Sequence, residues 1–533
     1  MKRVVLLFFV ALFSLVFASP AWAGGAGAPM QPFEQVLQRA EEGDVEAEVD
    51  IGMRYQTGEG VTRDVMRAIG WYGRAAEKGS AKAQFYLGIL YFNGGDGVKQ
   101  NYAEALRWFR LSADQKTPAA QYNLGVHYEQ GLGVTKDEMQ AIAYYRLAAE
   151  QGYALAQYNL GYLLQEGLGT TRDPVAAFNW YRKAADQGLV MAMHNLSIAY
   201  FQGSGTLKND AEAYRWTSRA AIAGEPRAQY NLGFLYEKGA GVERNLAEAL
   251  RWYLRAAEQG NVDGQANAGR LHFNAEAGRV DAKEGLRWLR PAAGTGNKDA
   301  QNLLCGVYAR VFGVGRDDRE AVKWCRMAAD QGMVSAQVDL AILYMVGRGV
   351  DKDEAQAFEL FLKAAKQGNP QAQMNVGVMY LTGAGVAEDY AQAHRWFLAL
   401  ADRGDAKGQF NLGVMYANGQ GVEKNLKEAA RLYKLSADQG YALAQYNLGM
   451  AYLNGIGVEI DAPAAVQWFR RAAEQGNADA QFFLGIVYAR GDGVEQDLSS
   501  AAKWYAKAAA QGVKKAQELL AGLPKAYRDA AQP

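Results

Sequence analysis

Few residues of this chain have the types and spacing that catalysis or metal binding requires. Ser500 and Lys503 match a Ser-x-x-Lys nucleophile pattern, but the Ser-Asp-Asn and Lys-Thr-Gly companions of that chemistry are missing. Gly-x-Gly turns recur, yet none continues as Gly-Lys-Ser/Thr after a strand, as a phosphate-binding loop does. The four histidines are far apart and form no His-x-x-x-His or Cys/His cluster. The sequence therefore predicts no catalytic group, no cofactor and no metal site.

The two cysteines, Cys305 and Cys325, lie symmetrically about Gly315 in one predicted helical hairpin. An antiparallel hairpin would bring them together, and an oxidising compartment would permit a disulfide. The alternative is a pair of buried thiols, with Cys305 at a position for small residues and Cys325 at a position for aromatic ones. The sequence leaves both states open.

Amide and aromatic side chains that recur at equal spacing are better candidates for recognition. The asparagines are Asn123, Asn159, Asn195, Asn231, Asn267, Asn375, Asn411 and Asn447. Tyr122, Tyr158, Tyr230, Phe410 and Tyr446 each come directly before one of them. An asparagine amide both donates and accepts, so it matches a peptide backbone whatever the ligand's side chains are.

The spacing of these asparagines suits an extended ligand. Neighbouring helices pack about 8–10 Å apart, and an extended chain advances about 3.3 Å per residue. One asparagine would then meet roughly every third ligand residue. The alternative is that each asparagine bonds a neighbouring helix and sets the geometry between repeats.

Repeats of 36 residues carry these side chains. A small residue, typified by Gly449 in Ala-Gln-Tyr-Asn-Leu-Gly, marks the same position in every copy. It occurs at Gly52, Gly88, Gly125, Gly161, Ser197, Gly233, Gly269, Cys305, Ala341, Gly377, Gly413, Gly449 and Gly485. Eleven of the twelve intervals are 36 residues, and an extra glycine at Gly94-Gly95 explains the single interval of 37. Thirteen copies in register predict a repeat architecture.

Each copy has the pattern of two helices. The first is typified by residues 444–452, and a Gly-x-Gly turn follows it in most copies. An Asp or Asn, which are preferred N-cap residues, then stands at the same place in all thirteen copies. The second helix is typified by residues 249–257, and a glycine ends it in twelve copies. One pair cannot bury its apolar surface alone, so the pairs must stack.

The pattern Ala-x-x-x-Leu-Gly-x-x-Tyr, Gly-x-Gly-Val, Ala-x-x-Trp-Tyr-x-x-Ala-Ala-x-x-Gly resembles the Sel1-like repeat family, a relative of the tetratricopeptide repeats. The resemblance covers residues 44–512 and implies an all-α, right-handed α/α superhelical solenoid of about 13 helix-turn-helix repeats. Residues 24–43 resemble an N-terminal segment with a capping helix, and residues 513–533 a C-terminal capping helix with a tail. In such solenoids the first helices line a concave groove, so the asparagines and aromatic residues are expected there.

The composition narrows the classes of partner. Lys plus Arg and Asp plus Glu number 57 each, which gives no electrostatic reason to expect nucleic acid. Residues 1–23 have a basic start, an apolar run and small residues at Ala21 and Ala23, typical of a cleaved export signal. No later stretch is apolar for long enough to span a membrane. We therefore expect an exported protein, periplasmic or secreted.

The resemblance implies a non-enzymatic scaffold or adaptor that binds a protein or an extended peptide. Binding of a glycan is the main alternative, because the same aromatic positions would stack on sugars. Some cysteine-rich relatives have been proposed to hydrolyse cell-wall material or β-lactams, but this chain lacks their cysteine pair in every repeat.

Residues 270–325 depart most from the repeat pattern. Residues 275–278 replace the regular turn, Gly285 replaces an alanine, and Pro291 falls inside the second helix, where it should bend or shorten that helix. The segment is either a hinge or the product of tolerated drift.

Overall fold

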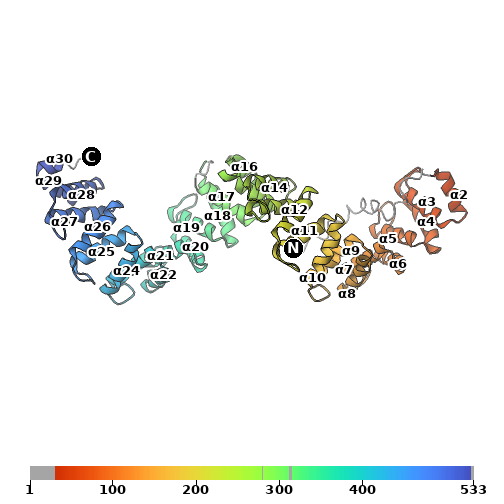
Figure 1. The fold of residues 1–533 in the computed structure, drawn as a ribbon, viewed down its shortest axis with the longest axis horizontal. Coiled ribbons are helices and arrows are strands. Elements are labelled where there is room, and N and C mark those ends of the chain that lie inside the picture. The colour runs from red at the N-terminus through yellow and green to blue at the C-terminus, as the bar shows by residue number, and fades with distance from the viewer. Residues whose placement is uncertain (1–30, 279, 311–314, 530–533) are drawn as a thin grey trace. The chain divides into compact units, whose positions relative to one another are not determined.

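The computed structural model of the protein describes residues 31–278, 280–310 and 315–529. Within these ranges the regular structure is entirely helical, with α-helices α2 to α30 and one short 3-10 helix, η2 (Ala275–Ala277). The predicted export signal, residues 1–23, lies outside the described residues. The prediction of an all-α solenoid built from thirteen helix pairs is confirmed (Figure 1).

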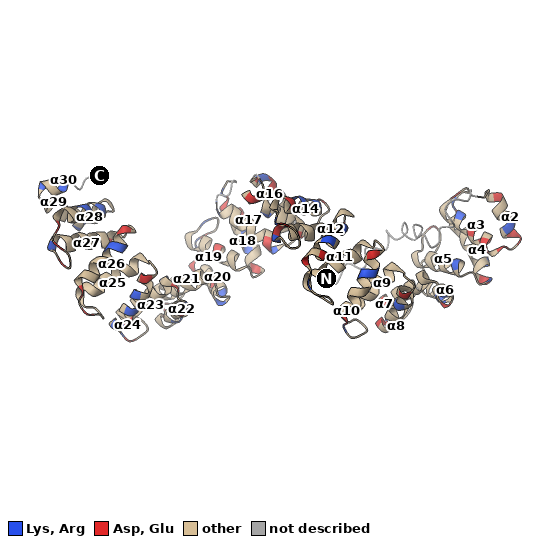
Figure 2. Ribbon diagram, viewed as in Figure 1, with Lys and Arg blue, Asp and Glu red and all other residues tan. Residues whose placement is uncertain are grey.

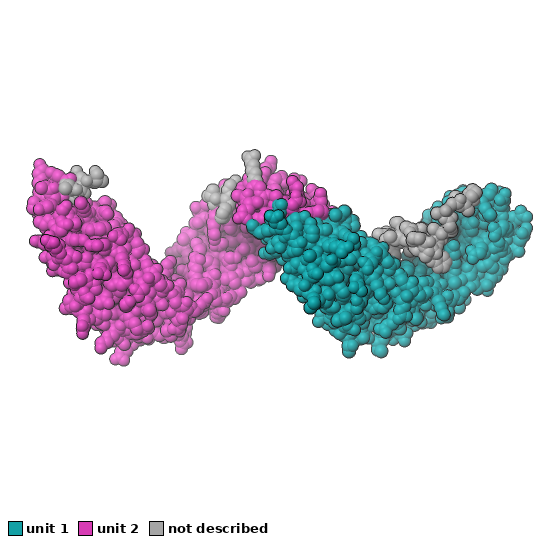
Figure 3. All heavy atoms as spheres, in the orientation of Figure 1, with its two compact units in different colours: residues 1–245 teal, residues 246–533 magenta. Residues whose placement is uncertain are grey.

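The helices form two compact units, one ending at Asn245 and one beginning at Leu246 (Figure 3). The first helices of the pairs are α3 (Val45–Thr57), α5 (Ala81–Asn93), α7 (Pro118–Gln130), α9 (Ala154–Glu166), α11 (Val190–Gln202), α13 (Pro226–Lys238), α15 (Val262–Leu271), α17 (Lys298–Ala309), α19 (Val334–Val346), α21 (Pro370–Thr382), α23 (Ala406–Asn418), α25 (Ala442–Asn454) and α27 (Ala478–Arg490).

The second helices are α4 (Val65–Glu77), α6 (Tyr102–Asp114), α8 (Glu138–Glu150), α10 (Pro174–Asp186), α12 (Asp210–Ile222), α14 (Leu246–Glu258), α16 (Ala282–Gly294), α18 (Asp318–Asp330), α20 (Glu354–Lys366), α22 (Tyr390–Asp402), α24 (Leu426–Asp438), α26 (Ala462–Glu474) and α28 (Leu498–Ala510). Helix α2 (Phe33–Glu41) precedes the pairs, and α29 (Lys514–Gly522) and α30 (Lys525–Asp529) follow them. Acidic and basic residues are interspersed along the helices (Figure 2).

The predicted caps explain where the helices begin and end. In twelve second helices the Asp or Asn side chain accepts a backbone N–H two or three residues further on, as Asp137 does from Gln140.

The second glycine of the turn between the two helices permits a close contact with the preceding repeat. A Cβ at Gly457, for example, would lie 2.0 Å from the carbonyl oxygen of Leu426. A side chain cannot be accommodated there.

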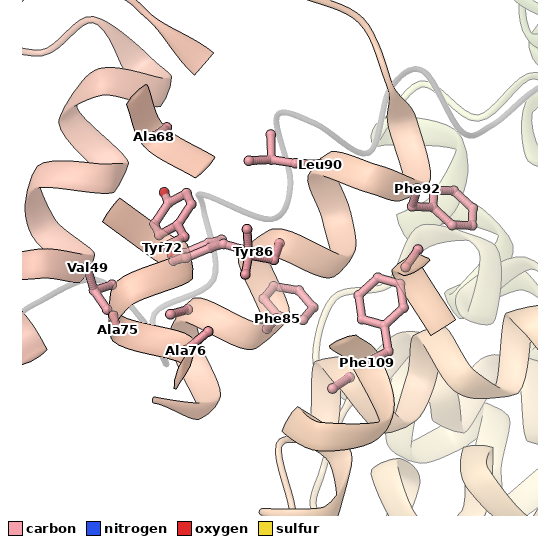
Figure 4. Packing of buried hydrophobic residues seen from close by; sticks show 14 of the residues in the cluster. Val49, Ala68, Tyr72, Ala75, Ala76, Phe85, Tyr86, Leu90, Phe92 and Phe109 are labelled. Carbon is pink, nitrogen blue, oxygen red and sulfur yellow. The ribbon is translucent and has the colours of Figure 1, made fainter. Parts of the chain in front are cut away.

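Within each pair, an aromatic ring of the second helix usually packs on the small residue of the first. A Cβ at Gly125 would lie 2.5 Å from the ring of Tyr145, and one at Gly88 would lie 2.6 Å from the ring of Phe109. Phe85 extends this packing, with its ring centroid 6.0 Å from that of Phe109 (Figure 4). The glycines therefore let the two helices approach until the ring touches the backbone.

A ladder of buried glutamines connects the helices, and sequence analysis did not single it out. Gln157 in α9 donates from Nε2 to the carbonyl oxygen of Ala149 (3.1 Å), and its Oε1 accepts from Gln187 at the end of the following second helix (2.7 Å). The same glutamine pair joins Gln84 to Gln115, Gln121 to Gln151, Gln301 to Gln331, Gln337 to Gln367, Gln409 to Gln439, Gln445 to Gln475 and Gln481 to Gln511.

Both members of the pair change together in two repeats. The first repeat has Glu48 and Lys78, whose Nζ–Oε1 distance is 3.0 Å. The fifth repeat has Met193 and Ala223, an apolar pair. The seventh and tenth repeats keep the first glutamine, Gln265 and Gln373, and replace only the second, by Thr295 and Arg403. The glutamine pair is therefore common but not obligatory.

We expect Gln157→Met alone to destabilise the first unit by about 2 kcal/mol, because the Ala149 carbonyl and the Gln187 amide lose a buried partner. Adding Gln187→Ala recreates the pair found at Met193 and Ala223 and should recover about half of that loss. Urea unfolding of the single and double variants gives the coupling. Strictly additive effects would show that the two glutamines do not act as a pair.

The departures near residue 270 have a packing explanation. Helix α15 has ten residues instead of the usual thirteen, and the ring of Phe273 beyond its end occupies the space that a Cβ at Gly285 would need, 2.5 Å away. Gly285 thus compensates for Phe273. The prediction that Pro291 would bend or shorten the second helix is wrong about length, because α16 keeps thirteen residues; Pro291 lies near its end with its ring exposed.

Cys305 of α17 and Cys325 of α18 form a disulfide, with their Cα atoms 4.7 Å apart. Both residues are fully buried. They occupy the positions where other repeats place the small residue and the aromatic ring. Of the two states that the sequence leaves open, the structure contains the disulfide.

Candidate functional site

The candidate site is the side of the first helices that faces away from the second helices. We define this inner face by the positions that correspond to Tyr446, Asn447, Met450 and Leu453 of α25 in each repeat. In the first unit, α5, α7 and α9 lie on the inner side of the bend and α6, α8 and α10 on its outer side (Figure 1). In the second unit, α17 contacts both α15 and α19, so successive first helices also approach one another directly.

All eight predicted asparagines are half-buried on this face. Three of them lie near tyrosine hydroxyls of the preceding repeat. The amide of Asn159 in α9 opposes the rise that burial causes in the pKa of Tyr122 in α7 and of Tyr145 in α8. Asn195 has the same effect on the pKa of Tyr158 and Tyr181. These amides lie between two repeats, which is the arrangement expected if asparagine sets the geometry between them.

Asn447 likewise opposes the rise in the pKa of Tyr433. The preceding second helix does not carry a tyrosine at this position in every repeat. Asn123 follows Phe109, which has no hydroxyl, and its Nδ2 donates instead to the carbonyl oxygen of Ala119 in its own helix (2.7 Å).

Asn411 follows Phe397 and behaves like Asn123, donating to the carbonyl oxygen of Lys407 (2.9 Å). Asn267 donates to the carbonyl oxygen of Asp263 (3.0 Å), and its Oδ1 accepts from Arg270. The asparagines are therefore not equivalent, and the Oδ1 atoms of Asn123 and Asn411 are the better placed to accept from a ligand. Asn231 and Asn375 are half-buried like the others.

The aromatic residues of the inner face are packed between repeats. Tyr122 is buried, and burial raises its pKa well above the ordinary value for tyrosine. Tyr158, Tyr230, Phe410 and Tyr446 are half-buried. Phe410, for example, contacts the ring of Tyr441, with ring centroids 5.3 Å apart. Each of these four side chains is partly accessible to a ligand, whereas Tyr122 is buried beneath the surface.

We expect Asn159→Ala to destabilise the first unit by about 2 kcal/mol, because the buried hydroxyls of Tyr122 and Tyr145 lose the polar amide that lies near them. Asn123→Ala is the matched control. It removes only a bond within one helix and introduces a better helix former, so its effect should stay within about 0.5 kcal/mol. Chemical denaturation measures both. Equal losses in the two variants would contradict the bridging role of Asn159.

The groups considered for catalysis have structural roles. The Ser500 hydroxyl donates to Asp497 Oδ2 (2.6 Å) as part of the cap of α28. His127 is buried, with Nδ1 2.6 Å from the carbonyl oxygen of Leu132, and burial lowers its pKa. Across the described ranges, no group of three or more His, Cys, Asp or Glu side chains is arranged to hold a metal ion.

The acceptors of the tyrosine hydroxyls on the inner face were missed by sequence analysis. Tyr72 Oη donates to Gln56 Oε1 (2.7 Å), and Tyr145 Oη donates to Glu129 Oε2 (2.5 Å). Gln56 and Glu129 occupy the same position of the repeat, the one that corresponds to Leu453. That position holds different residue types in different repeats, so the sequence alone does not identify Gln56 or Glu129 as an acceptor.

The family model of the Sel1 repeat matches thirteen segments of the chain. The matched residues are 45–80, 81–116, 118–153, 154–189, 190–225, 226–261, 262–296, 298–333, 334–369, 370–405, 406–441, 442–477 and 478–513. The chain belongs to the Sel1 repeat family. These Sel1 repeats coincide with the helix pairs described above, from α3 and α4 to α27 and α28.

Two solved structures of Sel1 repeat proteins are similar to this chain. A protective antigen present in uropathogenic Escherichia coli strains, which displays an SLR fold, is 32% identical, with 93% of this chain and 98% of that chain covered and a TM-score of 0.50. A Sel1 repeat protein from Oxalobacter formigenes is 30% identical, with 46% of this chain and 96% of that chain covered and a TM-score of 0.41. No curated protein matches the chain.

The Sel1 repeats make this chain a solenoid of a kind that generally serves as a scaffold for protein interactions and is typically not catalytic. Of the helices that the structure describes, none has the length and apolar character needed to cross a bilayer.

Proposed function

We propose that this Sel1 repeat protein is an exported, non-enzymatic adaptor, periplasmic or secreted, that binds a protein or an extended peptide along the inner face of its first helices. The basic and apolar pattern of residues 1–23 supports export. The similarity to a protective antigen of uropathogenic Escherichia coli strains also supports export, because a protective antigen is a protein that the host's immune system encounters.

The observation that carries the proposal is the make-up of the inner face. Half-buried amides and aromatic rings recur there at the same position of successive repeats, next to aliphatic side chains such as Ile198 in α11 and Val378 in α21. Amides that keep a free acceptor, as at Asn123 and Asn411, can bond a ligand backbone. The neighbouring apolar groups would bury ligand side chains.

The experiment selects ligands for the purified chain from a random peptide library and, in parallel, from a glycan array. Ile198→Lys and Val378→Lys place a charge on the inner face of the two units. Leu398→Lys on the second helix α22 is the control, because Leu398 (38%) and Val378 (37%) are almost equally exposed. We expect at least one inner-face variant to weaken binding of the selected peptides about tenfold, and the control to leave it unchanged.

Unchanged binding in both inner-face variants would show that the ligand contacts another surface. Selection of glycans but no peptides would favour the glycan-binding alternative. Turnover of cell-wall material or a β-lactam by the purified chain would refute the non-enzymatic assignment.

A further inference from the structure

A buried histidine faces a carboxylate where the fifth and sixth repeats meet. His194 of α11 holds the position of Tyr446, and only 12% of its side chain and 21% of that of Glu225 are exposed. Nδ1 of His194 lies 3.7 Å from Oε2 of Glu225, which is too far for a hydrogen bond. Within the described part of the chain this buried Nδ1 has no other hydrogen-bond partner.

The carboxylate that faces His194 also begins the next first helix. Glu225 is the N-cap of α13, and its Oε2 accepts a hydrogen bond from the backbone N–H of Ala228. The same oxygen therefore caps α13 and lies beside the imidazole of α11. A change in the charge of His194 acts directly on the start of α13.

A second contact connects α11 and α13 further along the two helices. The rings of Phe201 in α11 and Phe234 in α13 meet edge to face, with their centroids 5.9 Å apart. The two first helices are thus joined by one aromatic contact and by the pair of His194 and Glu225.

The fifth repeat lacks two features that hold most other repeats together. Met193 and Ala223 stand where the glutamine pair is usual, and Thr217 stands where most repeats have an aromatic ring. Fewer polar and aromatic interactions leave a larger share of the stability of this region to the contacts between α11 and α13.

The surroundings of His194 favour the neutral imidazole. Burial lowers its pKa the most, the charge of Arg227 in α13 lowers it further, and Glu225 opposes both. Tyr158 in α9 is influenced by the same two charges, and Tyr230 lies at the equivalent position of α13. Both tyrosines are neutral below pH 8, and no charge from the described residues of α10 or α12 acts on the imidazole.

The direction of the pH effect follows from the lowered pKa. In the unfolded chain His194 takes up a proton near pH 6.5, whereas the folded chain takes it up only at lower pH. The neutral imidazole therefore contributes its full stability above about pH 6.5, and this contribution is lost as the pH falls through the folded pKa.

We propose that His194 makes the contact between the fifth and sixth repeats a pH-sensitive joint, which is closed while the imidazole is neutral and loosens when it takes up a proton. Glu225 and Arg227 set the pH at which the joint responds, in opposite directions. The joint goes beyond the proposed function and does not depend on it, because no ligand takes part.

The chain itself supplies variants of the full-length protein that test this joint. His194→Tyr restores the tyrosine found at the same position in α9 and α13. Glu225→Asn removes the charge but keeps a cap, since Asn261 caps α15 by accepting from the N–H of Gly264. Arg227→Gln copies Gln371, which lies at the corresponding position of α21.

Two measurements follow the proton and the joint separately. In NMR titrations, we expect His194 to take up its proton at a lower pH than a histidine in the unfolded chain does. Glu225→Asn should shift that midpoint to lower pH and Arg227→Gln to higher pH, because the first removes an attractive charge and the second a repulsive one. Titration of His194 at the unfolded value, or no shift in either variant, would overturn the proposal.

Hydrogen exchange reports the loosening itself. Between about pH 7.5 and about pH 5.5, the protection factors of the amides in α11 and α13 should fall about fivefold in the wild-type chain and less than twofold in His194→Tyr. His127, whose pKa burial also lowers, is present in both proteins, so its effect cancels in the comparison. An equal fall in both proteins would show that His194 does not control the joint, and it would leave the proposed function untouched.

Discussion

Replacing Gly125 with valine is expected to destabilise the first unit by about 3 kcal/mol or more. Even a methyl group at Gly125 would lie 2.5 Å from the ring of Tyr145, closer than carbon atoms can approach. The ring cannot move aside, because Tyr145 is fully buried and its hydroxyl is bonded to Glu129. The helices α7 and α8 would have to separate, and the packing of the neighbouring repeats would loosen with them.

Gly73→Ala in α4 is the matched control for Gly125→Val. Gly73 also lies inside a helix, but a Cβ there would have no neighbour within 4 Å. Alanine should therefore stabilise α4 by about 0.5–1 kcal/mol, through lower backbone entropy in the unfolded chain. Urea denaturation followed by circular dichroism, with hydrogen exchange to locate the change, measures both variants. A mild effect of Gly125→Val would show that the ring packing is not tight.

Reduction of the bond between Cys305 and Cys325 is expected to lower the stability of their repeat by about 3 kcal/mol. The bond closes a loop across a sequence separation of 20 residues, and the loss of loop-closure entropy from the unfolded chain gives this magnitude. Intact mass in denaturant, with and without a reductant, should differ by about 2 Da if the purified chain carries the disulfide. Thermal unfolding under the same two conditions then measures its contribution.

The chain supplies its own control for the disulfide. The next repeat has Ala341 and Phe361 at the two corresponding positions, both buried. The double variant Cys305→Ala/Cys325→Phe copies that pair, so it should fold and should be insensitive to the reductant. Equal sensitivity of the wild-type chain and the double variant to the reductant would show that the disulfide contributes nothing.

The sequence by itself determined the helical pairs, their number and their ends. These features depend on interactions within a few residues, such as the cap at Asp137 or the left-handed glycine at Gly131, and thirteen copies repeat the same signal. Local backbone physics is sufficient for all of these conclusions.

Only the tertiary structure decided which partner each side chain takes. It joined Cys305 to Cys325, placed the amide of Asn159 near the tyrosine hydroxyls of the preceding repeat, and left Asn123 bonded within its own helix. The glutamine ladder and the hydrogen bond from Tyr145 to Glu129 were found in the same way. Most of these contacts join side chains that lie many residues apart in sequence and meet only when the helices stack.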